Sequence, residues 1–216
     1  VPPSALGAPA ARTAAYGAAA GLVATVAAFP VAVVSVRRPG RLAAVLERCG
    51  YVVLAVPGIV LALTLTFVTE RYAGGALYQT DALLVVAYAV MFFPLALVSV
   101  RASVARAPAE LEEIGRSLGR SRWQVLWRVT LPLVGPGLAA AFSLVFLEVV
   151  TELTATLVLI PTGAATLATQ FWSYETNLSY AQAAPYAAVM MAVAVVPSYV
   201  LGRWFDRMPA RQAVAP

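Results

Sequence analysis

The sequence predicts an all-α membrane protein: a bundle of about five transmembrane helices with one helix–turn–helix loop projecting from it. The composition is the first reason, because 61% of the residues are hydrophobic and only 12% are charged, whereas a soluble domain is about half apolar and a quarter charged. The second reason is that uncharged runs of the length needed to cross a bilayer recur along the chain. The third is a polar interruption at residues 101–132, which holds six of the fifteen arginines.

The uncharged runs place the spans and the segments between them. Residues 1–12 are rich in proline and alanine and are expected to be loose. Pro57-Gly58 should bend the second span. A break at Pro161-Thr162-Gly163 favours an excursion outside the membrane over 153–182, with a short helix near 165–172, rather than a sixth span. The expected spans lie at about 13–36, 49–69, 82–100, 130–152 and 183–203.

The arginines predict the orientation of the bundle. With five spans, thirteen of the fifteen fall on the side of the 101–131 loop, and only Arg12 and Arg71 fall on the other. An excess of positive residues marks the cytoplasmic side of a membrane protein. We therefore expect the N-terminus outside and residues 208–216 as a cytoplasmic tail. This distribution accounts for the net charge of +5, so no nucleic-acid partner is expected.

The loop itself has the pattern of two short amphipathic helices. Leu111, Ile114 and Leu118 are spaced i, i+3 and i+7, which puts them on one face of a first helix. Gly119 can adopt the left-handed conformation that ends such a helix. Ser121 and Gln124 have the spacing of a capping box that opens a second helix. From periodicity alone, a loop that packs on its own bundle and a loop that docks on a soluble partner remain equally open.

The loop resembles the "EAA" motif of ABC importer permeases. In that motif a Glu-Ala-Ala is followed by three variable residues and a glycine. Nine further variable residues then precede an aliphatic residue, one variable residue and Leu-Pro. Glu113, Gly119, Val129 and the Leu131-Pro132 pair keep this spacing, while Ile114 and Gly115 replace the two alanines. The residues that correspond to the family's ATPase-coupling helix are Glu112, Glu113, Ile114, Gly115, Leu118 and Gly119.

The resemblance implies the fold and the partners of the chain. Residues 13–207 would form a type I ABC importer transmembrane domain, with 101–131 as its coupling loop, in a bacterial cytoplasmic membrane. ATPase subunits, a second permease half or copy, and an extracytoplasmic solute-binding protein are the implied partners, with the lipid bilayer around the bundle. Because the chain begins at Val1 and the family often fuses two units, we expect part of a longer chain, and a natural half-permease stays open.

Two segments resemble the C-terminal half of iron(III)-type permeases more closely. They are VPGIVLALTL at 56–65 and ELTATLVLIPTGAATLATQFW at 152–172, where the family commonly has proline in place of Thr154. The resemblance implies iron(III) as the solute. Thiamine, polyamine and sulfate permeases share much of the pattern, so these solutes remain alternatives.

Polar side chains at the outer end of the fourth span form the candidate translocation path. Glu148 and Glu152 lie one helical turn apart, and an ionisable group within a span usually faces a bundle interior or a wet path. Thr151 and Thr154 add hydroxyl groups, although such threonines often bond to the preceding turn of their own helix. An ion-coupled secondary transporter that uses Glu148 and Glu152 as a relay is the alternative of another class.

The sequence favours a transport subunit over an enzyme. It has no histidine, a single cysteine (Cys49) and no glycine-rich phosphate loop, so we expect no catalytic residue, no metal site and no cofactor bound by this chain. ATP would be bound and hydrolysed by a partner subunit.

Overall fold

The computed structural model describes residues 3–206, and every regular element among them is helical. The elements are, in chain order, α1 (Pro3–Arg37), α2 (Arg41–Val52), η1 (Val53–Ala55), α3 (Gly58–Tyr72), α4 (Asp81–Arg106), α5 (Ala109–Ser117), α6 (Arg122–Val125), η2 (Leu126–Thr130), α7 (Leu131–Thr151), α8 (Thr154–Leu159), α9 (Leu167–Thr176) and α10 (Tyr180–Asp206).

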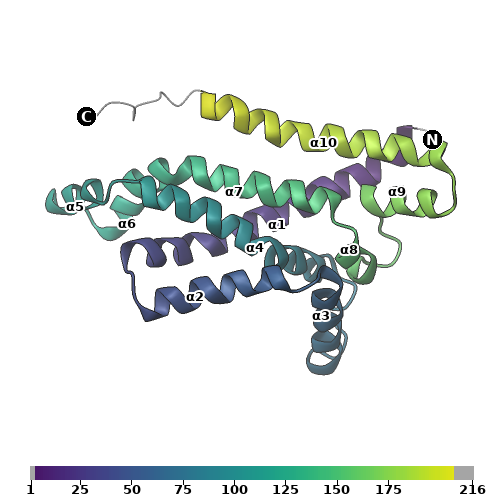
Figure 1. Cartoon of the computed structure of the whole chain (residues 1–216), viewed down its shortest axis with the longest axis horizontal. Helices are drawn as coiled ribbons and strands as arrows, with labels where there is room; N and C mark the ends of the chain where they lie inside the picture. Colours follow the sequence, from purple (N-terminus) through teal and green to yellow (C-terminus); the bar gives the residue numbers. More distant parts are fainter. Residues whose placement is uncertain (1–2, 207–216) are drawn as a thin grey trace.

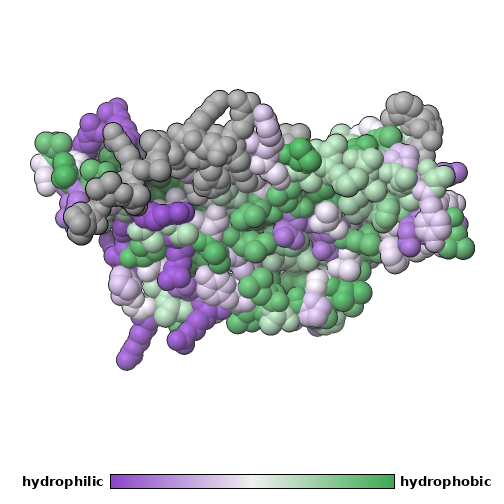
Figure 2. Space-filling model, turned by 45° about the horizontal axis from the view of Figure 1, so that its top comes forward, coloured by the Kyte–Doolittle hydropathy of each residue, from purple (hydrophilic) through white to green (hydrophobic). Residues whose placement is uncertain are grey.

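Four long helices, α1, α4, α7 and α10, run along the long axis of the molecule (Figure 1). The short helices α5 and α6 lie at one end, here called the basic end, and α8 and α9 lie at the other, here called the far end. Apolar surface covers the middle, and hydrophilic surface gathers at the basic end (Figure 2). Four of the described helices are long and apolar enough to cross a membrane. A fifth span results if the bent pair, α2 with η1 and then α3, is counted as one span. The predicted all-α membrane fold is confirmed.

Helix α1 corrects the expectation of a loose segment at residues 1–12, because the helix already begins at Pro3. Alanine, the best helix former, dominates this segment, and Pro3 stands in the first turn, where its missing N–H is no loss. The hydroxyl of Thr13 accepts a hydrogen bond from the backbone N–H of Leu167 at 2.9 Å and ties α1 to the start of α9. Between residues 20 and 32, every fourth residue of α1 is a buried alanine, which lets α1 lie close to α4 and α7: Ala20, Ala24, Ala28 and Ala32.

The second expected span, 49–69, is two helices rather than one. Helix α2 with η1 and helix α3 meet at an angle of 108°. Pro57 lacks an N–H and forces the preceding Val56 out of the helical conformation, to φ −94° and ψ 118°. The bend that the Pro57-Gly58 pair predicts is present, and it is large enough to turn α3 away from the bundle axis (Figure 1).

The fourth span is longer than the expected 130–152, and the second loop helix is not separate from it. Helix α6, η2 and α7 form one helical run from Arg122 to Thr151. Pro132 therefore lies inside the run. Its ring would crowd the carbonyl of Arg128, four residues earlier, and the π-helical turn at η2 widens the helix directly before it. The second helix of the loop and the membrane span are thus one continuous helical run.

The segment after α7 contains two short helices, α8 and α9, and α9 covers most of the helix expected at 165–172. Helix α10 packs against α7 and α9 and extends beyond the expected 183–203 at both ends. The expected tail at 208–216 lies outside the described residues.

Candidate functional site

The loop at the basic end presents an apolar stripe outward. Leu111, Ile114 and Leu118 are 41%, 54% and 74% exposed, and their spacing puts them on one face of α5. Trp123 and Trp127, on the helical run that follows, are also mostly exposed. Large apolar side chains that point into water at the tip of a polar loop are typical of a surface that another protein covers.

Local hydrogen bonds hold the two helices of the loop at a sharp angle. Gly119 has φ +80°, and the N–H groups of Gly119 and Arg120 donate to the carbonyls of Arg116 and Gly115, which is a Schellman ending. Ser121 and Gln124 then form the predicted capping box, with bonds of 3.3 Å and 3.0 Å. The turn is thus fixed by residues that sequence reasoning identified.

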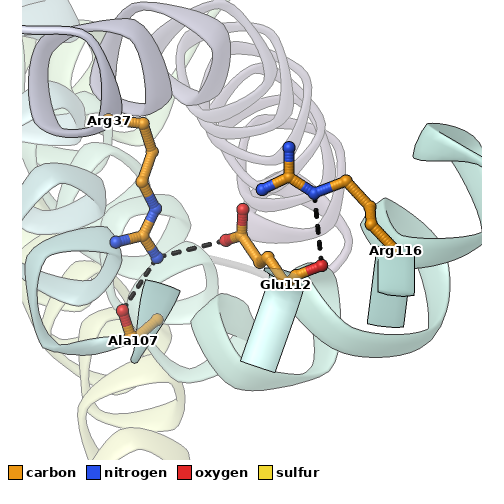
Figure 3. Close-up of polar contacts among 4 residues, drawn as sticks. All are labelled: Arg37, Ala107, Glu112 and Arg116. Atoms are coloured by element: carbon orange, nitrogen blue, oxygen red, sulfur yellow. Dashed lines mark hydrogen bonds and ion pairs between the residues drawn. The ribbon is translucent and has the colours of Figure 1, made fainter. Parts of the chain in front are cut away.

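An ion pair joins the opposite face of α5 to α1 (Figure 3). Nη2 of Arg37 donates to Oε1 of Glu112 at 3.1 Å and to the carbonyl oxygen of Ala107 at 2.8 Å. Both charged side chains are only 19% exposed. Glu112 therefore connects the loop at the basic end to the first helix, and Ala107 connects the same arginine to the end of α4.

The other predicted coupling residues lie partly on the inner face of α5, toward α1 and α6, and partly on its outer face. Gly115 is buried, and a methyl group added to it would lie 3.2 Å from Cγ2 of Val125, so the glycine lets α5 lie close to α6. Glu113 is exposed on the side of α5 that faces α1, where it lines a cavity. Ile114 and Leu118 face outward, and Gly119 makes the turn.

Glu112→Gln is expected to loosen the packing of α5 against α1. The charged pair with Arg37 is mostly shielded from solvent, so its loss should cost about 1 kcal/mol and raise the rate of chymotryptic cleavage within the loop about fivefold. The measurement is limited proteolysis of the purified chain in detergent.

Glu110→Gln is the matched control, because Glu110 is exposed on the same helix and makes no described contact. The double variant Arg37→Glu with Glu112→Arg should restore part of the protection by re-forming the pair in reverse. Equal cleavage of the Glu110 and Glu112 variants would contradict a stabilising role for the pair.

The expected path residues do not share one face. Helix α7 ends at Thr151, and Glu152 has left the helical conformation. Its carboxylate accepts hydrogen bonds from Oγ1 of Thr154 at 2.7 Å and from the N–H of Ala155 at 2.9 Å, so it caps the N-terminus of α8. A methyl group added to Gly58, at the start of α3, would lie 3.7 Å from the same carboxylate. Glu152 thus lies near the positive ends of two helix dipoles.

Glu148 is exposed on α7, and no described residue forms an ion pair or hydrogen bond with its carboxylate. The hydroxyl of Thr151 donates to the backbone carbonyl of Glu148 at 3.2 Å, which is the self-bonding expected of a helical threonine. A carboxylate exposed on the side of an apolar helix is costly against lipid. Glu148 is therefore expected to face water or a polar group rather than lipid.

Two contacts beside the candidate residues were not predicted from the sequence. Buried Tyr88 and Thr156 share a hydrogen bond of 2.6 Å that links α4 to α8 beside Glu152, and neither residue has a local signal. Arg37 is the first charge after the uncharged run 13–36, but nothing in that position predicts a partner 75 residues away. Among the described residues, histidine, cysteine, aspartate and glutamate form no cluster suited to a metal ion.

Curated relatives place the chain among membrane transport subunits. It is 36% identical over 183 residues to the Fe(3+)-transport system permease protein FbpB 2 of Haemophilus influenzae, with 85% of this chain and 36% of that one covered. It is 30% identical to the molybdenum transport system permease protein ModB of Escherichia coli, with 60% and 58% covered. A putative 2-aminoethylphosphonate transport system permease protein, PhnV of Salmonella typhimurium, is 28% identical, with 73% and 59% covered. The chain thus spans between about a third and three fifths of these relatives' lengths.

Solved structures share the fold at low sequence identity. The inward-facing MetNI methionine ABC transporter superposes with a TM-score of 0.70 at 20% identity, covering 92% of this chain and 95% of that one. An amino acid ABC transporter gives 0.64 at 17% identity, covering 91% and 90%. Residues 20–212 match the family described as "Binding-protein-dependent transport system inner membrane component". The chain therefore belongs to this family of ABC importer permeases, whose members are transport subunits rather than enzymes.

Proposed function

We propose that the chain is the membrane unit of an ATP-driven importer whose ATPase subunit docks on α5. The exposed stripe of Leu111, Ile114 and Leu118 carries this proposal, because burying apolar side chains is the main source of binding energy at a protein interface. The stripe is backed by a helical run that continues from Arg122 to Thr151. Movement of a docked subunit would therefore be transmitted directly along α7 to Glu148.

The proposal includes an orientation and further partners. The arginines at the basic end support a cytoplasmic location of α5, with the start of α1 outside. A second permease half or copy would provide a polar neighbour for Glu148, and a binding protein would deliver solute at the far end. Nucleotide would be bound by the ATPase subunit alone.

Iron(III) is the solute that we propose. The support is the 36% identity to a relative named for Fe(3+) transport, over most of this chain. Molybdenum and 2-aminoethylphosphonate are the competing solutes that the names of the other relatives suggest. Thiamine, polyamine and sulfate remain alternatives from the sequence pattern.

The test is uptake by cells that express the complete transporter containing this chain with its genetically neighbouring subunits. Radioactive iron(III) should accumulate, unlabelled iron(III) should compete, and molybdate and 2-aminoethylphosphonate should not. Competition by molybdate or the phosphonate in place of iron would reassign the solute. Uptake that stops on collapse of the proton gradient but survives ATP depletion would favour the ion-coupled carrier and overturn the importer.

Glu148→Gln is expected to lower uptake by more than about tenfold, which corresponds to about 1.4 kcal/mol in the transport barrier. The substitution removes the charge but keeps the size of the side chain, so the bundle should assemble normally. Initial uptake rates at equal membrane abundance are the measurement. Glu175→Gln, in α9 and outside the spans, is the control, and wild-type uptake by the Glu148 variant would exclude a role in the path.

A further inference from the structure

A cavity of about 460 Å³ lies at the basic end, between the last turns of α1 and the loop helices. Four arginines and two glutamates line it, which leaves a formal excess of two positive charges. The charged lining residues are Arg37, Arg38, Arg116, Arg122, Glu112 and Glu113. The Glu112 carboxylate pairs with Arg37, and no carboxylate among the described residues pairs with Arg38, Arg116 or Arg122. The cavity is thus a basic site with unneutralised guanidinium groups.

The cavity and the docking stripe lie on opposite faces of α5. Ala109, Glu112, Glu113 and Arg116 line the cavity and are spaced i, i+3, i+4 and i+7, so they share one face. The stripe that begins at Leu111 occupies the other face. A subunit that covers the stripe would therefore leave the cavity open toward α1.

One wall of the cavity is apolar and continues into the membrane-spanning part of α1. Val33 and Val34 line the cavity. One and two turns further into the span, Pro30 and Val26 are exposed on the same helix face, four residues apart. An apolar strip about as wide as one helix face thus leads from the membrane interior to a group of arginines.

We propose that this cavity binds an anionic phospholipid, with the phosphate on Arg38, Arg116 and Arg122 and an acyl chain along the Val26–Val34 face of α1. Arginine binds phosphate through paired, charge-assisted hydrogen bonds. Basic pockets between helices at the membrane surface are suited to acidic headgroups. A soluble anion would use the arginines but would leave the apolar strip uncovered. The proposal does not depend on the transport function, because it concerns only how this chain meets the bilayer.

The test measures lipid retention by the purified full chain in detergent doped with phosphatidylglycerol or phosphatidylcholine, counted by native mass spectrometry. Wild type should retain phosphatidylglycerol preferentially. The double variant Arg116→Gln with Arg122→Gln should weaken that preference about 25-fold, at about fivefold for each arginine. The control is Arg120→Gln with Arg128→Gln, which removes the same charge from exposed positions of the same loop outside the cavity.

Three alternatives to a bound phospholipid, namely diffuse surface charge, a free phosphate ligand and a protein partner, each predict a different result. Equal loss in the two double variants means diffuse surface charge and overturns the site. Displacement of phosphatidylglycerol by millimolar glycerol 3-phosphate means a free phosphate ligand and overturns the lipid. If the cavity variant keeps its lipid but loses a second copy of the chain or an ATPase subunit, the cavity belongs to that protein and the proposal is wrong. Arg116→Lys with Arg122→Lys should retain most of the preference, and its failure to do so with normal folding would contradict a phosphate site.

Discussion

Gly137→Ala is expected to prevent the close packing of α4 against α7. A methyl group at Gly137 would overlap Cβ of Ser103 and lie 2.6 Å from its Oγ and 3.3 Å from the carbonyl oxygen of Ser99. Neither backbone can yield locally, because Ser103 and Ser99 also donate hydrogen bonds to the carbonyls of Val134 and Gly137. We expect a cost at or above the upper end of the about 1–3 kcal/mol typical of overpacking.

The measurement is the yield of monodisperse protein and its unfolding temperature in detergent. Gly135→Ala is the matched control, because Gly135 lies on the same helix two residues earlier and nothing stands within 4 Å of an added methyl group. Gly137→Ala combined with Ser103→Gly should recover much of the lost stability, since the obstructing side chain is gone. A Gly137 variant as stable as the Gly135 variant would show that the two helices are not packed at this point.

This contact also shows what the sequence can and cannot reveal. The glycine at 137 sits in an uncharged run, and its small size is visible, but its neighbour is 34 positions away and has no motif. Small residues let membrane helices approach closely, yet the sequence does not say which pairs of helices meet. The number and approximate place of the spans follow from hydropathy, whereas their packing partners require the structure.

The elements built from local chemistry were predicted well. The capping box at Ser121 and Gln124, the left-handed Gly119 and the bend at Pro57-Gly58 all depend on residues within a few positions of one another. The errors have local and distant parts. Residues 3–12 are helical, with alanine as the local reason, and Thr13 attaches the helix to the distant α9. Glu152 lies outside α7 and caps α8, two to three residues on, while Gly58 of α3 lies beside its carboxylate.

The candidate site also has one part that the sequence predicts and one part that it does not. The apolar stripe of α5 follows from helical periodicity and was predicted to the residue. Its opposite face, with the ion pair between Arg37 and Glu112, was not, because opposite charges far apart in a sequence carry no sign of pairing. The roles assigned to the coupling and path residues stay predictions until variants are measured. Substitutions in the apolar stripe of α5 test the docking role most directly.

Leu118→Asp is expected to weaken ATPase docking by about thirtyfold or more, which corresponds to a loss of about 2 kcal/mol at an interface hot spot. Leu118 is 74% exposed, so the substitution should leave the chain folded while placing a charge where an apolar groove would cover it. Co-purification of the tagged chain with the ATPase subunit encoded beside it, over a range of subunit concentrations, measures the change.

Ser117→Asp is the control, because the neighbouring residue is also exposed, receives the same new side chain, and points about a quarter turn away from the stripe. Charge repulsion would weaken both variants alike, whereas loss of an apolar contact would weaken Leu118→Asp alone. Ile114→Asp should behave like Leu118→Asp, since both share the face. If all three variants bind as wild type does, the subunit docks elsewhere, and the continuous helix from the loop into the membrane loses its role as the transmitting element.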